Sequence, residues 1–254
     1  MSAVPDSPHV YRDAEAVARA AARLFVLAAQ TSVRARGRFH VALAGGSTPR
    51  RTYELLASAP YCAQVPWQAV EIYFGDERAV GPEDPRSNFG MVRECLLRPV
   101  GLPASQVHRM AGEQRPLADA AMSYQRDLAT GFRTPPDGPA PRFDLVLLGM
   151  GTDGHTASLF PGTAALTQWH RWVVVNDVPQ LGEQRLTFTM PVLVRARRTL
   201  FMVAGKDKAA MLARVFAWSP ADPLPCQSAM PERGQAMWLV DAAAASRFGR
   251  GRHR

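Results

Sequence analysis

Apolar runs alternate with amphipathic segments along most of this chain. Residues 143–148 and 199–203 are largely apolar runs, which are typical of strands buried on both faces of a sheet. Shorter runs predict further strands at residues 39–44, 70–74, 172–175, 185–190 and 237–240. Amphipathic or alanine-rich segments predict helices at residues 13–36, 50–57, 89–97, 116–132, 206–217 and 242–245.

The order of these elements determines the predicted fold class. Strands that alternate with helices predict an α/β protein with a mainly parallel sheet and crossover helices on its faces. Loops are expected at residues 81–87 and 134–142, which are rich in proline. Because the spacing is even and no repeat is present, we expect a single domain over residues 1–246. The basic residues 247–254 are expected to form a disordered tail.

Length and composition are those of a globular protein. The 254 residues fit one large α/β domain or two small ones, and 47% of them are hydrophobic. No uninterrupted apolar run is long enough to span a membrane, and the first residues lack a secretory pattern. Cys62, Cys95 and Cys226 are far apart, which suits reduced thiols rather than a disulfide framework or a zinc site. We therefore expect a cytoplasmic protein.

The chain has a basic surplus, with 30 Lys and Arg against 22 Asp and Glu and a net charge of +8. Such a surplus attracts nucleic acid, anionic membranes or small phosphorylated metabolites. The arginines are dispersed, and no basic stripe with interleaved aromatic residues is present. The pattern favours a small anionic ligand without a nucleic-acid or membrane partner, bound by a monomer or small homo-oligomer.

A glycine turn, Gly45-Gly46-Ser47-Thr48-Pro49, joins the first predicted strand to a helix. Glycines let the backbone approach a ligand, and the N–H groups and dipole of the helix start favour an anion. The turn lacks the Gly-Lys-Ser/Thr element of nucleotide-binding P-loops. Two interpretations stay open, a phosphate cradle and an ordinary turn capped by Ser47 or Thr48.

Three charged residues follow the next strand, in the segment Gly75-Asp76-Glu77-Arg78. Such a segment is usually a solvated loop, but it lies at the same predicted sheet edge as the glycine turn. Arg78 is suited to bidentate binding of a phosphate or carboxylate. Asp76 is suited to orienting a ligand hydroxyl or acting as a base.

A histidine follows the strand at residues 143–148, after Gly149, Gly151 and Asp153. Ligands bind at the carboxyl ends of strands in open α/β sheets, so His155 is a candidate for acid–base chemistry near neutral pH. Asp153 is placed to fix the turn or to orient the histidine ring. The spacing of the histidines and acids is not that of a metal site, and no metal is expected.

Two further basic positions are candidates for an anion site. Lys206 and Lys208 lie where a predicted strand leads into a helix, and cations are not favoured by the dipole at a helix start. An anion nearby explains them, as does a solvated lysine pair. Arg185, at the start of a strand, is a weaker candidate whose alternative is an ordinary surface residue.

Together these motifs resemble those of the 6-phosphogluconolactonase family. The matching motifs are Gly45-Gly46-Ser47-Thr48-Pro49, then Gly75-Asp76-Glu77-Arg78 together with Ser87-Asn88, then residues 149–162, then Arg185-Leu186-Thr187, and finally Gly205 with Lys208-Ala209. They occur in the family's order. The third motif, residues 149–162, is long and specific, and the others support it.

The resemblance implies a modified Rossmann-like sheet shared with sugar-phosphate isomerases and deaminases. It also implies hydrolysis of 6-phospho-D-glucono-1,5-lactone to 6-phospho-D-gluconate, the second step of the oxidative pentose phosphate pathway, with no cofactor. Catalytic roles are expected for His155, Asp153 and Arg78. Substrate binding is expected for Gly45, Gly46, Ser47, Thr48, Asp76, Asn88, Arg185 and Lys208.

Two alternatives remain beside the lactonase. Glucosamine-6-phosphate deaminases share several motifs, but their pattern has an acid five residues after the histidine, where this chain has Phe160. Their pattern also has an aromatic residue where this chain has Arg78. The other alternative is a non-catalytic sugar-phosphate sensor, which the Asp153-Gly154-His155 motif disfavours.

Overall fold

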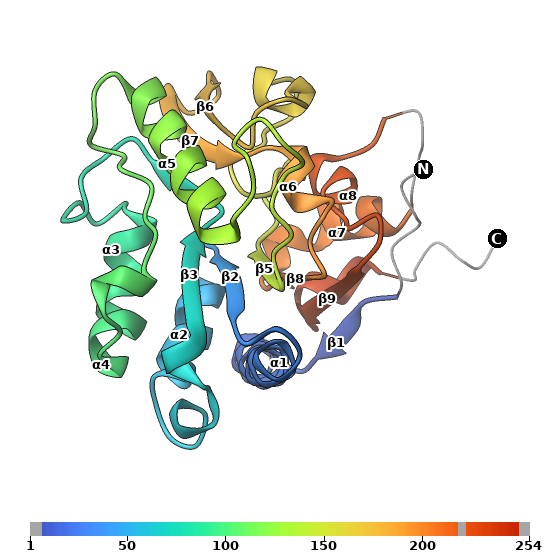
Figure 1. The fold of residues 1–254 in the computed structure, drawn as a ribbon. Helices are drawn as coiled ribbons and strands as arrows, with labels where there is room; N and C mark the ends of the chain where they lie inside the picture. The colour runs from blue at the N-terminus through green and yellow to red at the C-terminus, as the bar shows by residue number, and fades with distance from the viewer. Residues whose placement is uncertain (1–6, 218–221, 249–254) are drawn as a thin grey trace.

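A six-stranded sheet forms the centre of the chain in the computed structural model, which describes residues 7–217 and 222–248 (Figure 1). All its strands are parallel, in the order β1-β9-β8-β5-β2-β3. They are β1 (His9–Tyr11), β9 (Gln235–Asp241), β8 (Arg198–Val203), β5 (Leu145–Leu148), β2 (Phe39–Leu43) and β3 (Val70–Phe74). The predicted α/β class with a mainly parallel sheet is confirmed.

Helices and a second sheet cover the two faces of this sheet. One face carries α1 (Ala14–Arg36), α2 (Ser47–Leu56), α3 (Asn88–Val92) and α4 (Arg98–Val100). The other carries α5 (Leu117–Phe132), α6 (Met190–Leu193), α7 (Ala209–Phe216) and α8 (Pro225–Ser228). Each face therefore has its own core, and both cores share the sheet.

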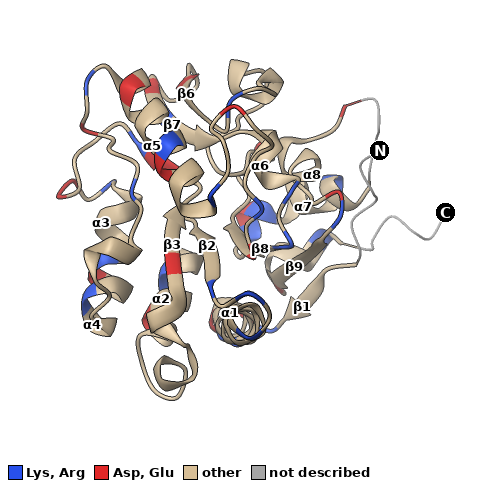
Figure 2. Ribbon diagram, in the orientation of Figure 1, with Lys and Arg blue, Asp and Glu red and all other residues tan. Residues whose placement is uncertain are grey.

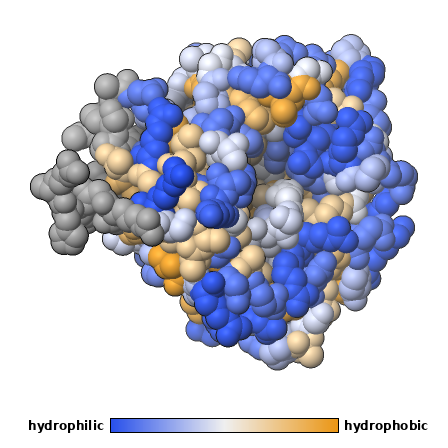
Figure 3. Space-filling model, turned by 180° about the vertical axis from the view of Figure 1, so that it is seen from behind, coloured by the Kyte–Doolittle hydropathy of each residue, from blue (hydrophilic) through white to orange (hydrophobic). Residues whose placement is uncertain are grey.

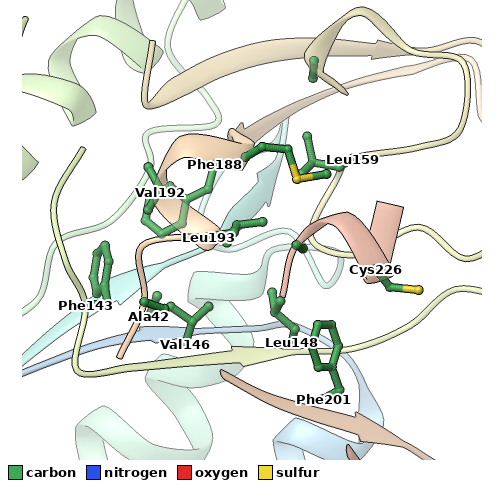
Figure 4. Packing of buried hydrophobic residues seen from close by; sticks show 14 of the residues in the cluster. Ala42, Phe143, Val146, Leu148, Leu159, Phe188, Val192, Leu193, Phe201 and Cys226 are labelled. Atoms are coloured by element: carbon green, nitrogen blue, oxygen red, sulfur yellow. The ribbon is translucent and has the colours of Figure 1, made fainter. Parts of the chain in front are cut away.

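The strand period of two divides the residues of β5 between the two cores. Leu145 and Leu147 pack with the helices on the α1 face. Val146 and Leu148 face the opposite core, which Figure 4 shows in close view. Burial on both faces explains why this strand is almost continuously apolar.

The longest helix, α1, begins and ends as its sequence predicts. The Asp13 carboxylate accepts a hydrogen bond from the Ala16 N–H at 2.8 Å, and Gly37 closes the helix with a φ of 75°. By length and composition α1 is apolar enough to cross a membrane, and it is the single such helix in the described part of the chain. Its apolar face is buried against the sheet, as in the core helix of a globular protein.

A smaller antiparallel sheet lies over the carboxyl end of the main sheet. Its order is β4-β7-β6, formed by β4 (Asp76–Arg78), β7 (Glu183–Phe188) and β6 (Val173–Val178). The expectation of a loop at residues 76–78 was wrong. The reason is that β4 pairs with β7, a strand that is remote in the sequence. The local pattern of residues 76–78 does not predict such a pairing.

Several other boundaries differ from the prediction. The segment 89–97 divides into α3 and a π-helical turn, η3 (Arg93–Leu97). The helix expected at residues 206–217 starts with a 3₁₀ turn, η6 (Lys206–Lys208), before α7. The last predicted helix is also a 3₁₀ turn, η7 (Ala244–Arg247). Elements not predicted are β1, α4, α6, α8 and the 3₁₀ turns η1 (Cys62–Gln64), η2 (Trp67–Ala69), η4 (Ala104–Gln106) and η5 (Ala164–Thr167).

The end of the fold lies slightly beyond the predicted tail boundary. Arg247 closes η7, and the Phe248 ring packs edge-on against Phe216 at 5.1 Å between centroids. Residues 249–254, the rest of the predicted tail, lie outside the described residues.

Candidate active site

A cleft of about 280 Å³ opens at the carboxyl ends of β2, β5 and β8, with β4 and β7 on its other side. It brings together every predicted site residue except Asp153, which does not line the cleft but contacts His155. The predicted residues lining the cleft are Gly45, Gly46, Ser47, Thr48, Asp76, Arg78, Asn88, His155, Arg185 and Lys208. Parallel strands ending at one edge explain this convergence.

His155 and Asp153 form a hydrogen-bonded pair. The ring Nδ1 of His155 lies 2.6 Å from Asp153 Oδ1, and the His155 backbone N–H donates to the same oxygen at 3.1 Å. This contact assigns the neutral ring's proton to Nδ1, so Nε2 carries a free lone pair. Burial by itself raises the pKa of Asp153, but the hydrogen bonds and charge of His155 outweigh it and lower that pKa. Asp153 is therefore ionised at neutral pH.

The turn around His155 is tightly constrained. A side chain at Gly151 would collide with the His155 ring and with Asp153. Gly154 has a φ of +84°, in the left-handed region that favours glycine. The Phe160 ring stacks on the His155 ring at 4.0 Å between centroids. The glycines and the Phe160 ring together fix the orientation of the His155 ring, whose Nδ1 faces Asp153.

The glycine turn presents an uncapped helix start to the cleft. Gly46 is the N-cap of α2, with a φ of 108°, and no side chain caps the helix. Capping by Ser47 or Thr48 is therefore ruled out, because both lie inside the helix. The free N–H groups and the positive dipole end favour an anion here. A side chain at Gly45 would collide with Asn88, so close packing requires glycine at that position.

Arg78 and Arg185 lie directly opposite each other on β4 and β7. Like charges in such a cross-strand pair repel. The Nε atoms of both arginines are buried without a hydrogen-bond partner among the described residues. Arg185 also donates to Glu183 at 2.9 Å, and Arg78 donates to the Arg86 carbonyl at 2.5 Å. The unpartnered donors of these two arginines favour an anionic ligand in the cleft.

One of the two candidate lysines belongs to the cleft. Lys208 lines it, with its Nζ 3.4 Å from Asp207 Oδ2, whereas Lys206 is exposed and does not. Gly205, with a φ of 104°, turns the chain between β8 and η6, and its N–H donates to the Asp241 carboxylate. The 3₁₀ turn therefore places Lys208 at the cleft and Lys206 outside it. The spacing of the two lysines in the sequence does not predict this difference.

A buried polar network joins Asp76 to the histidine segment. Asp76 Oδ2 accepts a hydrogen bond from Ser158 at 2.7 Å, and Asp76 Oδ1 accepts one from Asn88 Nδ2 at 3.3 Å. Because both carboxylate oxygens are engaged, orientation of a ligand is a better role for Asp76 than acting as a base. Ser158 was missed as a site residue, and its position inside the long third motif was the available signal.

Glu77 is a second residue whose role was missed. It is 2% exposed and accepts backbone hydrogen bonds from Arg78, Asn88 and Phe89, each at 2.8 Å. Ser87 Oγ donates to it at 3.1 Å. Burial raises the pKa of Glu77, and these backbone N–H groups act in the opposite direction. Glu77 thereby holds together the loop that carries Arg78 and Asn88.

The described residues contain no group of three or more His, Cys, Asp and Glu side chains suited to holding a metal ion. The polar side chains that line the cleft are two arginines, a lysine, a histidine, the hydrogen-bonded carboxylate of Asp76, and the hydroxyl and amide groups of Ser47, Thr48, Asn88 and Thr156. This donor set suits a phosphorylated organic anion better than a divalent cation.

Known proteins share both the sequence and the fold. Residues 12–238 match the profile of the family described as glucosamine-6-phosphate isomerases/6-phosphogluconolactonase. The chain is 41% identical to 6-phosphogluconolactonase from Nostoc sp., over 84% of this chain and 86% of that protein. It is 34% identical to 6-phosphogluconolactonase from Mycobacterium tuberculosis, over 95% and 98%.

A solved structure extends the likeness to the tertiary level. The 6-phosphogluconolactonase from Trypanosoma brucei superposes with a TM-score of 0.86 at 26% identity, covering 97% of this chain and 100% of that one. The resemblance and the fold that the motifs implied are thus confirmed. The chain belongs to the glucosamine-6-phosphate isomerase/6-phosphogluconolactonase family.

Proposed function

We propose that this chain hydrolyses 6-phospho-D-glucono-1,5-lactone to 6-phospho-D-gluconate. The observation that carries the proposal is His155, whose Nε2 is free and whose ring lines a cleft with three basic side chains. A base and an anion site in one cleft fit a phosphorylated substrate with an electrophilic carbonyl. The relatives named above, which carry the same activity in their names, support it.

In the proposed mechanism, His155 acts as the general base. Its Nε2 takes a proton from water as the water oxygen attacks the lactone carbonyl carbon. The tetrahedral intermediate then collapses, the bond to the ring oxygen breaks, and His155 returns the proton to that oxygen. Ionised Asp153 stabilises the imidazolium that forms between these steps. Such general base catalysis contributes about 10²–10⁴-fold.

The remaining cleft residues are assigned to binding. Arg185, Lys208 and the start of α2, with Ser47 and Thr48, are proposed to hold the phosphate. Arg78 and the N–H groups of the glycine turn are proposed to stabilise the oxyanion that develops on the carbonyl. Asp76 and Asn88 are proposed to orient the sugar hydroxyls.

The deaminase alternative lacks a proton relay in this cleft. The position five residues after His155 is Phe160, and its ring lies flat against the histidine. A phenyl ring transfers no proton, so we propose that Phe160 restricts His155 to a single base role. No feature of the cleft favours the deaminase over the lactonase.

The test is lactone hydrolysis by purified wild-type protein and by His155→Asn, measured above spontaneous hydrolysis. We expect His155→Asn to remain folded and lose about 10²-fold or more in kcat. Near wild-type kcat in the folded variant would remove His155 as the base. Wild-type protein that binds the product but hydrolyses no lactone would support a sensor instead.

We also propose that the protein works in the cytoplasm as a monomer or small homo-oligomer. Cys62, Cys95 and Cys226 are free, and burial raises the pKa of the Cys226 thiol to about 12. Cysteines without disulfide bonds suit a reducing compartment.

A further inference from the structure

A second, larger pocket lies at the opposite edge of the main sheet from the cleft. Its volume is about 750 Å³, and it opens where β2, β5 and β8 begin. Figure 2 shows basic segments between α1 and the start of β2, at one side of this region. We call it the amino-edge pocket, and its basic lining residues are Arg36, Arg38, Arg133, Arg142, Arg195 and Arg197.

The carboxylates of the amino-edge pocket balance only part of this charge. Asp144 pairs with Arg36 at 2.8 Å and lies 3.4 Å from Arg197 Nε. Glu71 pairs with Arg38. These two are the carboxylates that line the pocket, against six arginines. The pocket is therefore strongly electropositive without a ligand.

Three of the arginines have no carboxylate partner in the described part of the chain. Among residues 7–217 and 222–248, Arg133 and Arg195 form no ion pair, and Arg142 donates only to the Arg233 carbonyl at 2.8 Å. Their guanidinium groups keep most of their donors for a further acceptor.

Two buried polar atoms in the pocket wall are also unsatisfied. Arg197 Nε lies 3.4 Å from the Asp144 carboxylate but makes no hydrogen bond among the described residues, and the buried His40 Nδ1 makes none either. Burial, followed by the charges of Arg36 and Arg142, lowers the pKa of Arg197. Mutual repulsion of this kind is relieved by an anion placed among the three guanidinium groups.

Helix dipoles explain only some of these arginines. Arg36 lies in the last turn of α1 and Arg133 caps the end of α5, where positive charge is favourable. Arg142 and Arg197 instead lie just before β5 and β8, where no helix end requires them. Their convergence on one pocket needs another explanation.

We propose that the amino-edge pocket is a second binding site, for a small polyphosphorylated anion. Planar guanidinium forks bind phosphate oxygens in pairs, and the volume lies within the range of small-molecule sites. The half-buried Phe132 ring, 4.3 Å from His40, adds an apolar wall for an attached organic group. This site is separate from the cleft, because the strands of the main sheet run between them.

The test is calorimetric titration with inorganic pyrophosphate at low salt, in the Arg185→Ala background that weakens the cleft. Adding Arg142→Gln and Arg195→Gln together should weaken pyrophosphate binding about tenfold or more. The control pair Arg23→Gln and Arg126→Gln removes the same charge from exposed positions on α1 and α5 outside both pockets. It should leave the affinity nearly unchanged. With Arg185 intact, the pocket pair should also retain wild-type kcat on the lactone.

Three outcomes would overturn the proposal. The first is equal affinity of the pocket pair and the control pair, which would make the effect one of net charge. The second is no pyrophosphate binding in the Arg185→Ala protein. The third is binding of a single-stranded oligonucleotide, dependent on Arg142 and Arg195, with pyrophosphate failing to compete.

Discussion

His155 and Asp153 are two residues apart, and their contact is made within one turn of the chain. Local contacts of this kind follow from sequence, because glycine positions and short spacing restrict the backbone to few conformations. The orientation of Asp153 toward Nδ1 was one of two roles that the motif allowed. Phe160 was identified as the residue that replaces an acid, but its stacking on His155 is a product of the fold.

Asp153→Asn tests the carboxylate that contacts the His155 ring. The amide that replaces the Asp153 carboxylate no longer stabilises the His155 imidazolium. It can also leave the proton of the neutral ring on Nε2 instead of Nδ1. We expect kcat to fall by up to the about 10²–10⁴-fold that general base catalysis contributes, with KM little changed. Steady-state kinetics on the lactone check this. A kcat equal to that of wild type would mean that Asp153 serves only the turn.

Gly151→Ala tests the turn that holds His155 and Asp153 together. The added Cβ collides with the His155 ring and Asp153, so the pair must separate. We expect a loss of kcat of about tenfold or more, because a shift near 1 Å costs that much or more. Gly81→Ala is the matched control, since its Cβ would meet ordinary contact at 3.9 Å. Equal activity of the two variants would show that the turn accommodates a side chain.

The strand β4 forms one side of the cleft through Asp76 and Arg78. Its three residues look like a solvated loop, but pairing with β7 buries Asp76 and Glu77 and sets Arg78 against Arg185. Sequence indicated each arginine as a candidate without indicating their pairing. Register between strands remote in sequence depends on long-range contacts, which local patterns do not encode.

Glu77→Gln tests the role of Glu77 in joining β4 to α3. The amide keeps one acceptor and turns an NH₂ group toward backbone donors, so a buried N–H is left without a partner. We expect a loss of about 1–3 kcal/mol in the free energy of unfolding, together with a raised KM. Denaturant unfolding checks the first effect. Glu232→Gln, the same change at an exposed position, should lie within about 0.5 kcal/mol of wild type.

Arg185→Ala tests the cross-strand arginine pair. Removing one guanidinium group relieves repulsion in the empty cleft but removes a phosphate ligand. We therefore expect KM to rise about tenfold or more while kcat changes less. An unchanged KM would take Arg185 out of the site.

Two hydrophobic cores share one sheet, and we propose that they form a single domain, which extends to Phe248. The face seen in Figure 3 is mostly hydrophilic, with small separate hydrophobic patches. Large exposed apolar side chains are scattered, as at Leu27, Met122 and Trp169. Basic residues are likewise spread over many elements (Figure 2), in agreement with the dispersed arginines of the sequence.

One whole-molecule prediction concerns the link between α5 and β3 through His108. Its Nδ1 lies 2.9 Å from Asp127 and its Nε2 3.3 Å from Glu71. Burial alone lowers the pKa of His108, but Asp127 and then Glu71 outweigh it and raise that pKa above 6.5. The stabilisation is therefore fully present below pH 6.5 and is lost as pH rises through the folded-state pKa.

Free energies of unfolding, measured from below pH 6.5 to above the folded-state pKa of His108, check the prediction. We expect His108→Gln to flatten the decline of stability with rising pH. The exposed His170→Gln should keep the wild-type slope. Parallel slopes for wild type and His108→Gln would show that the link does not depend on protonation.

The α/β class, the turn that presents His155 and the glycine start of α2 can all be predicted from the amino-acid sequence. These features depend on periodicity and on backbone preferences over a few residues, which act locally. In contrast, long-range contacts make β4 a strand, set Arg78 opposite Arg185, and bring Lys208 rather than Lys206 to the cleft. They also gather six arginines from separate segments into the amino-edge pocket. The physical reason is that strand register and side-chain burial depend on contacts between residues remote in the chain.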